Sequence, residues 1–201
     1  MKQSSFLFQF MKNPKTVGAV LPSSGFLGDK MIEGIDFNEA KYIVEYGPGT
    51  GIFTEKLVKK RNDRTVILLV ENNKEFYLAL KEKFKEESNL FIVYGSALNI
   101  EQYIKKFNIP YVDYVISGLP FASLPKKISS EILSNTTKIL KKDGQFITFQ
   151  YTKYKKAFIE KFFNKIDIKK EYRNLPPAYV FNCTIQGQHV EGFYGVRNFN
   201  C

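Results

Sequence analysis

Hydrophobic and polar positions along the chain follow two alternating periods. Short apolar runs are followed by segments in which apolar positions recur every three or four residues, which is typical of strands alternating with helices. This order predicts one α/β domain whose mostly parallel sheet is connected by crossover helices. The expected strands cover 41–46, 65–71, 90–94, 111–117, 144–151, 167–173 and 178–186. The expected helices cover 2–12, 25–34, 51–60, 73–86, 99–107, 125–141 and 154–164.

Composition narrows the class of protein. Hydrophobic residues make up 44% of the 201 residues, enough for one buried core. No apolar run approaches the roughly 18–20 residues of a membrane-spanning helix, and the N-terminus lacks a signal-peptide cleavage site. Cys183 and Cys201 form no disulfide framework or metal-ligand spacing. We therefore expect a cytoplasmic protein without a metal site.

The charge is strongly positive and carried mostly by lysine. The net charge is +10, and only four of the 30 basic residues are arginine. Residues 138–170 hold ten lysines against three acidic residues. Such an excess predicts attraction to phosphate-bearing partners, either lipid or nucleic acid, although a solvated lysine-rich surface is the plain alternative.

A glycine turn, EYGPGTG at 45–51, follows the first expected strand. Alternate glycines let the backbone turn sharply and approach a ligand, and the next helix offers free amide donors. Glu71 ends the second strand, where a carboxylate can accept ribose hydroxyls. A nicotinamide fingerprint would need its third glycine at Ile52, so the spacing argues against a nicotinamide site. The glycine turn together with Glu71 favours an adenosyl cofactor over an ordinary tight turn, with Gly47, Gly49, Gly51 and Glu71 as the contacts that these residues indicate.

The turn resembles motif I of class I S-adenosylmethionine-dependent methyltransferases. Within that class, the chain resembles the bacterial phospholipid N-methyltransferase family, which is related to the ribosomal RNA adenine dimethylases. The segments that carry the resemblance are FMKNPKTVGAVLPSS at 10–24, EYGPGTGIFT at 45–54, ENN at 71–73, SGLPFASLP at 117–125 and NLPPAYVF at 174–181. The resemblance implies a Rossmann-like fold with an antiparallel C-terminal hairpin in a seven-stranded sheet. It also implies S-adenosylmethionine as donor and phosphatidylethanolamine as acceptor, at an anionic membrane surface.

Two further loops gain expected roles from this resemblance. After the third strand, Ser96 and Ala97 are expected at the adenine edge, although an aspartate is commonest in that loop. At the end of the fourth strand, Ser117 is expected to contact the cofactor. The resemblance extends the expected cofactor contacts around the glycine turn and Glu71 to Glu45, Pro48, Thr50 and Asn72. The expected substrate contacts are Gly118, Leu119, Pro120 and Phe121.

The chain is expected to divide into three parts. Residues 1–34 supply an amphipathic helix and a cofactor-covering segment ending in Pro22-Ser23-Ser24, and residues 35–186 form the methyltransferase domain. The tail, 187–201, has no assigned role. The helix over 2–12 carries an apolar stripe beside lysines, which favours peripheral attachment to anionic lipid, with core packing as the alternative.

Two tyrosines are the candidate catalytic residues. An ethanolamine ammonium must lose a proton before it attacks, so a base or a pocket that favours the neutral amine is needed. Tyr151 ends the fifth strand and Tyr179 follows the Pro-Pro turn, and their rings can also hold a methylated ammonium. Partly buried structural tyrosines are the alternative. Lys153, Lys155 and Lys156 are candidates for pairing with a lipid phosphate.

Two other functions remain open from the sequence. An RNA adenine methyltransferase would fit the glycine turn and the basic surface. However, such enzymes place an asparagine or aspartate where Ser117 or Gly118 stands, and the 28 residues after Arg173 are too few for their RNA-holding domain. A catalytically silent cofactor-binding protein is the third possibility.

Overall fold

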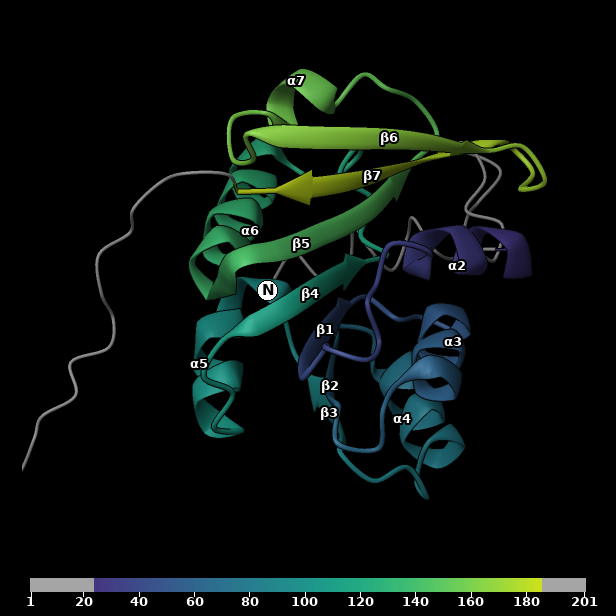
Figure 1. Ribbon diagram of the computed structural model, residues 1–201, viewed down its shortest axis with the longest axis vertical. Coiled ribbons are helices and arrows are strands. Elements are labelled where there is room, and N and C mark those ends of the chain that lie inside the picture. Colours follow the sequence, from purple (N-terminus) through teal and green to yellow (C-terminus); the bar gives the residue numbers. More distant parts are fainter. Residues whose placement is uncertain (1–23, 186–201) are drawn as a thin grey trace, which may run out of the picture.

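The computed structural model describes residues 24–185, which form one seven-stranded sheet with helices on both faces (Figure 1). The strand order is β3-β2-β1-β4-β5-β7-β6, and β7 runs in the direction opposite to the other six strands. The strands are β1 (Tyr42–Tyr46), β2 (Val66–Glu71), β3 (Leu90–Tyr94), β4 (Val112–Ser117), β5 (Leu140–Gln150), β6 (Lys165–Glu171) and β7 (Ala178–Thr184). The predicted fold, including the antiparallel C-terminal hairpin, is confirmed.

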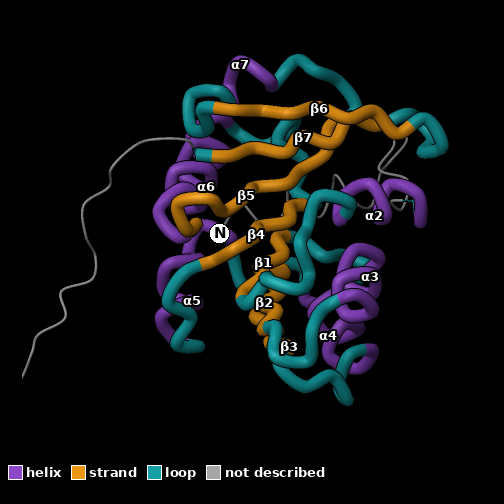
Figure 2. The backbone as a smooth tube through the Cα atoms, viewed as in Figure 1, coloured by secondary structure: helices purple, strands orange, loops and turns teal. Residues whose placement is uncertain are grey.

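Two layers of helices cover the sheet, as Figure 2 shows. One layer holds α2 (Gly25–Ile32), α3 (Ile52–Lys60) and α4 (Lys74–Lys83). The other holds η1 (Ala97–Asn99), α5 (Ile100–Lys106), α6 (Lys126–Ile139) and α7 (Lys156–Ile159). Successive strand residues point to opposite faces, so Ile43 belongs to the core under α2 and α3, and Val44 to the core under α6. This double burial explains why the parallel strands are continuously apolar.

The predicted helix over 154–164 is wrong in extent, because only α7 is helical there. Phe163 is fully buried and stacks on Phe146, with ring centroids 5.3 Å apart. The chain then enters β6 at Lys165. Packing of the Phe163 ring into the core therefore overrides the helical pattern of this segment.

The predicted boundary between helix 125–141 and strand 144–151 is also shifted. α6 ends at Ile139, and β5 begins immediately at Leu140, which pairs with Val112 of β4. Lys141 then forms an ion pair with the buried Asp113, with Nζ 2.7 Å from Oδ1. These contacts with β4 draw the end of the expected helix into the sheet.

Some predicted features lie outside the described residues: helix 2–12, nearly all of segment 16–24, and the tail 187–201. Within residues 24–185, no helix is long and apolar enough to cross a membrane. The same residues contain no cluster of three or more histidine, cysteine or acidic side chains suited to a metal ion.

Candidate functional site

The loops after the parallel strands are joined by backbone hydrogen bonds at the carboxyl edge of the sheet. The N–H of Gly47 donates to the carbonyl of Val70 across 2.9 Å, which ties the loop after β1 to β2. The N–H of Gly118 donates to the carbonyl of Tyr46 across 2.8 Å, which ties the loop after β4 to β1. The predicted glycine turn and the predicted acceptor loop are therefore in direct contact.

The glycine turn adopts a backbone conformation that other residues rarely tolerate. Gly47, Gly49 and Gly51 have φ values of 62°, 56° and 81°. A Cβ at Gly47 would lie 3.0 Å from the side chain of Leu119, and a Cβ at Gly51 would lie 3.0 Å from Leu80 and Phe84. A Cβ at Gly49 would meet no atom of residues 24–185 within 4 Å. Neighbouring side chains therefore crowd any side chain at Gly47 and Gly51, whereas Gly49 faces space that the described residues leave open.

Glu71 links the glycine turn to the start of α4. Its Oε2 accepts the N–H of Gly49 across 3.0 Å, and its Oε1 accepts the N–H of Asn73 across 2.8 Å. The side chain is almost fully buried, and this burial raises its pKa despite the amide donors. Each carboxylate oxygen retains a lone pair, so Glu71 can still accept a ligand hydroxyl.

Glu45 is a second buried carboxyl beneath the turn. The hydroxyl of Thr54 in α3 donates to its Oε2 across 2.7 Å, whereas Oε1 has no partner among the described residues. Burial, and secondarily the charge of Glu71, raises the pKa of Glu45 to about 8. A buried acceptor without a partner is costly, which makes this atom a candidate for satisfaction by a ligand.

Neither the last residue of β4 nor the first residue of the loop after it offers a side-chain amide or carboxylate. Ser117 is fully buried, and its hydroxyl oxygen accepts the N–H of Leu119 across 3.2 Å. A Cβ at Gly118 would lie only 2.6 Å from the carbonyl oxygen of Gly47. Because both atoms belong to joined loops, an asparagine or aspartate at position 118 would force them apart.

The predicted substrate contacts divide into exposed and buried residues. Gly118, Leu119 and Pro120 are partly exposed at the edge of the sheet. Phe121 is fully buried and packs edge-to-face on Phe146, with ring centroids 5.9 Å apart. Its ring therefore lies in the core of this structure and offers no free face to a substrate.

The remaining predicted cofactor contacts surround the turn. The carbonyl of Pro48 accepts the N–H of Gly51 across 2.9 Å, and Thr50 and Asn72 are exposed. Ser96 caps η1 by accepting the N–H of Leu98 across 3.3 Å, and Ala97 is buried. The hydroxyl of Ser96 thus has a structural partner, and its role at the adenine edge stays a prediction.

The two predicted catalytic tyrosines lie on opposite faces of the sheet. Tyr151 belongs with Phe149 to the core under α2, and Tyr179 packs on the core under α6. The hydroxyl of Tyr151 is buried and has no partner in full hydrogen-bonding geometry among the described residues. Burial raises its pKa, and the side chain of Asn174 opposes this rise. The ring of Tyr179 already contacts Lys153 and Lys170, whose Nζ atoms lie 5.2 and 5.5 Å from its centroid. The structure therefore does not bring these tyrosines together.

Two buried amides near Tyr151 did not stand out in the sequence as site residues. Gln150 ends β5, and its Nε2 has no partner among the described residues. The Oδ1 of Asn174 accepts the N–H of Ser24 across 3.1 Å, which holds the start of α2 against the β6–β7 hairpin. A polar residue at the end of an apolar strand, as in FITFQY at 146–151, was the available signal for Gln150.

The candidate phosphate-binding lysines behave differently from one another. Lys156 pairs with Glu160 one helical turn away, with Nζ 2.6 Å from Oε1. Lys153 and Lys155 instead lie over aromatic rings. Only the latter two keep their charge away from an acidic partner in the described contacts.

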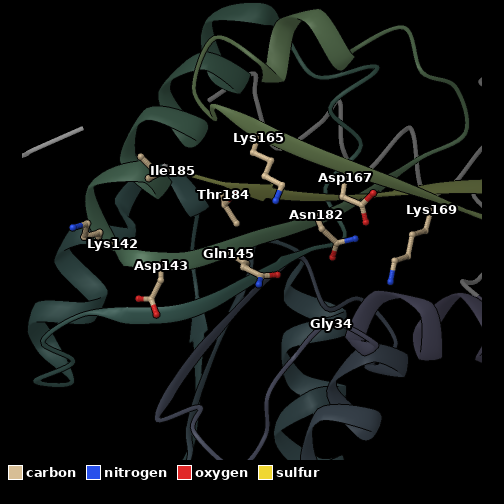
Figure 3. Close-up of a pocket in the computed structure, with 10 residues that line it drawn as sticks. All are labelled: Gly34, Lys142, Asp143, Gln145, Lys165, Asp167, Lys169, Asn182, Thr184 and Ile185. Carbon is tan, nitrogen blue, oxygen red and sulfur yellow. The ribbon is translucent and has the colours of Figure 1, made fainter. Parts of the chain in front are cut away.

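A polar cavity of about 530 Å³ lies on the exposed face of β5, β7 and β6 (Figure 3). Its charged lining residues are Lys142, Asp143, Lys165, Asp167 and Lys169. It includes Gln145, which pairs with Tyr114 at the amino-terminal part of β5, whereas Thr148 pairs with Ser117 at the carboxyl end of β4. The cavity is therefore displaced along the sheet from the glycine turn.

Known proteins similar to this chain are methyltransferases. A model of the ribosomal RNA adenine dimethylase family matches residues 1–176. Ornithine lipid N-methyltransferase of Singulisphaera acidiphila is 29% identical over 180 residues, which are 89% of this chain and 93% of that protein. Ribosomal RNA small subunit methyltransferase A of Mycoplasma capricolum is 35% identical over 131 residues, which are 64% of this chain and 46% of that protein.

Solved structures share the fold at low sequence identity. A precorrin-6y C5,15-methyltransferase from Geobacter metallireducens has a TM-score of 0.63 and 14% identity, covering 80% of this chain and 87% of that one. With the family match, this likeness identifies the fold as that of the Rossmann-like methyltransferases, whose methyl donor is S-adenosylmethionine.

The residues around the glycine turn fit this donor. Gly49 faces open space, Glu71 has lone pairs for ribose hydroxyls, and Glu45 has an unpartnered oxygen. S-adenosylmethionine carries a sulfonium and an ammonium group, and a nearby cation favours the charged form of buried carboxyls. Burial raises the pKa of Glu45 and of Glu71, and a cationic ligand bound beside them would favour their charged forms.

Proposed function

Because the chain belongs to the ribosomal RNA adenine dimethylase family of S-adenosylmethionine-dependent methyltransferases, we propose that it methylates the amine of a membrane lipid head group, with phosphatidylethanolamine as substrate. The observation that carries this proposal is the match to ornithine lipid N-methyltransferase, which runs over 93% of that protein. The ribosomal RNA relative from Mycoplasma capricolum corresponds to this chain over only 46% of its length.

The loop after β4 supports a lipid acceptor over adenine. Recognition of an adenine amine would call for a side-chain amide or carboxylate at this loop and a free aromatic face. Ser117 is buried, Gly118 has no room for a side chain, and Phe121 packs in the core. Adenine methylation remains the second candidate, favoured by the family match over residues 1–176 and by the net charge of +10.

The proposed chemistry divides between the donor and the chain. Bound S-adenosylmethionine supplies an activated methyl group for in-line displacement, so the protein aligns the amine and excludes water. Glu71 binds the donor's sugar. The apolar surroundings favour the neutral amine, and the Tyr151 hydroxyl, which keeps its proton because its pKa is raised, accepts a hydrogen bond from that amine.

A labelled-methyl assay tests the proposal directly. Vesicles containing phosphatidylethanolamine, vesicles containing an ornithine lipid, and ribosomal RNA are offered side by side, with Glu71→Ala as the inactive control. We expect label in the phosphatidylethanolamine vesicles. Label in RNA alone would replace the proposal with the adenine reaction. Absence of label from all three, with tight donor binding retained, would instead favour a silent protein.

Peripheral attachment to an anionic membrane belongs to the same proposal. Residues 2–12 are predicted to form the interfacial helix. Deleting residues 1–12 should abolish binding to anionic vesicles while leaving affinity for S-adenosylmethionine unchanged. Vesicle binding that is unaffected by the deletion would reject this role for the segment.

A further inference from the structure

The most exposed large hydrophobic side chains gather at the carboxyl edge of the sheet. Tyr154, Leu175 and Tyr172 have exposed fractions of 85%, 75% and 71%. The next most exposed among the described residues, Leu78 and Tyr94, reach only 53%. The first belongs to the segment that follows β5, and the other two to the turn between β6 and β7. Isolated exposed apolar residues are ordinary, but several on neighbouring loops indicate a contact surface.

Cationic side chains are interleaved with these rings. The Nζ of Lys170 lies 4.4 Å from the centroid of the Tyr172 ring and 5.5 Å from that of Tyr179. The Nζ of Lys153 lies 5.2 Å from the centroid of the Tyr179 ring as well. The Nζ of Lys155 lies 5.9 Å from the ring of Tyr154. The hairpin and the segment after β5 therefore form one continuous aromatic and basic surface.

The acidic residue next to the turn, Glu171, does not cancel this positive charge. Glu171 is covered by Arg173, whose Nε lies 2.9 Å from its Oε1, and this ion pair lowers the pKa of Glu171 to about 2. The guanidinium of Arg173 also lies 4.4 Å from the ring centroid of Phe26, which is itself exposed on α2. Lys153, Lys155 and Lys170 are left to give the surface its positive charge.

We propose that the hairpin surface, formed by Lys153, Tyr154, Lys155, Lys170, Tyr172 and Leu175, inserts into the head-group region of an anionic membrane. Tyrosine rings favour the membrane interface, and lysines pair with lipid phosphates. Leu175 at the turn, with Pro176 and Pro177 beside it, offers apolar area to the acyl boundary. Figure 1 shows this turn projecting past the carboxyl ends of β4 and β5.

This inference rests on the proposed lipid methylation and specifies how the site meets its substrate. The hairpin surface flanks the edge that carries the glycine turn and the loop after β4. A head-group amine could therefore reach that edge while its acyl chains stay in the bilayer. A single-stranded RNA could also use tyrosines and lysines, but Leu175 lacks the aromatic face on which bases stack.

A fluorescent reporter at the turn tests the insertion. Leu175→Cys is labelled with an environment-sensitive dye in a Cys201→Ser background, since Cys183 is fully buried. The full chain is mixed with vesicles of phosphatidylethanolamine and phosphatidylglycerol. We expect a blue shift, a severalfold rise in emission and protection from an aqueous quencher. The matched control, Leu78→Cys on α4, should stay water-like.

A binding measurement distinguishes the contribution of the hairpin surface to membrane binding from that of residues 2–12. Tyr172→Ser with Leu175→Ser should weaken vesicle binding by about tenfold or more while far-ultraviolet circular dichroism and donor affinity stay unchanged. Leu78→Ser should bind vesicles like the parent chain. A dye at position 175 that stays water-like, with or without vesicle binding, overturns the inference. So does a double variant that loses RNA binding and keeps vesicle binding.

The outcomes remain distinct from those of the proposed function. If lipid is methylated while position 175 stays in water, the proposed function stands and the hairpin surface is rejected. If position 175 enters the bilayer and no lipid is methylated, the surface stands and the proposed substrate is rejected.

Discussion

The backbone N–H of Gly49 donates to the carboxylate of Glu71 across 3.0 Å. This bond joins the middle of the glycine turn to the tip of the neighbouring strand. Because Asn73 donates to the other carboxylate oxygen, Glu71 fixes the turn and the entry to α4 together. One side chain thus positions two loops and presents the acceptor atoms expected to bind the donor's ribose.

Replacing the carboxylate of Glu71 by an amide should weaken cofactor binding. In Glu71→Gln, one of the two acceptor oxygens becomes an NH2 group facing an amide donor. A hydrogen bond to a charged group contributes about 1.5–3 kcal/mol, so the dissociation constant for S-adenosylmethionine should rise roughly tenfold to a hundredfold. Calorimetry measures it, with the exposed Glu75→Gln as matched control. Equal affinity in both variants would remove Glu71 from the site.

A methyl group at Gly118 should separate the loops after β1 and β4. In Gly118→Ala, the new Cβ would lie 2.6 Å from the carbonyl oxygen of Gly47, a backbone atom with no freedom to turn away. We expect a loss of about 1–3 kcal/mol in stability and weaker donor binding. Urea unfolding and calorimetry check both. Gly25→Ala, where a Cβ meets nothing within 4 Å, should match the parent chain or exceed its stability.

A methyl group at Gly49 should affect the ligand more than the fold. The φ of 56° makes alanine cost about 1 kcal/mol, but no atom of the described part of the chain lies within 4 Å of the added Cβ. The methyl would point into the space expected to hold the donor. Gly49→Ala should therefore lose affinity for S-adenosylmethionine by well over tenfold with only that small stability cost. Unchanged affinity would show that the donor lies elsewhere.

The raised pKa of Glu45 predicts that the stability of the protein declines as pH rises. Burial raises its pKa from 4.5 to about 8, so between these values the folded protein holds a proton that the unfolded chain has lost. Stability then falls as pH rises through this window, by at most about 1.4 kcal/mol per pH unit, and is unaffected below it. Glu45→Gln keeps an acceptor for Thr54 and should remove this slope.

Denaturant unfolding at pH 5.5, 7 and 8.5 measures the effect, because those values span the window set by Glu45. The stability of Glu45→Gln relative to the parent chain should increase as pH rises. The exposed Glu39→Gln should show the same dependence of stability on pH as the parent chain. Parallel curves for Glu45→Gln as well would mean that the Glu45 carboxyl is already ionised when folded.

Removing the hydroxyl of Tyr151 should leave the fold intact and impair turnover. The hydroxyl is buried beside Asn174 and has no partner in full hydrogen-bonding geometry among the described residues, so Tyr151→Phe should cost little stability. Turnover on phosphatidylethanolamine should fall by more than tenfold, with donor affinity unchanged. Radiolabel incorporation measures it, and Tyr111→Phe is the control. Parental rates would exclude Tyr151 from the reaction.

The local pattern predicted most of the fold because neighbouring positions determine it. The apolar strands, the glycine spacing at 47, 49 and 51, and the acidic end of β2 were all readable from short segments. The end of α6 and the length of α7 were not. They depend on Leu140 pairing with Val112 and on Phe163 stacking on Phe146, which are contacts between distant segments.

The sequence by itself determined the sheet and the glycine turn, since each follows from periodicity or from backbone freedom at fixed positions, and it indicated the class of cofactor through a resemblance to known methyltransferases. Only the tertiary structure decided which side chains face the edge. It buried Phe121, placed Tyr151 and Tyr179 on opposite faces, and left no room for a side chain at Gly118. The physical reason is that strand register and loop packing, set by residues far apart in the chain, fix the direction of each side chain.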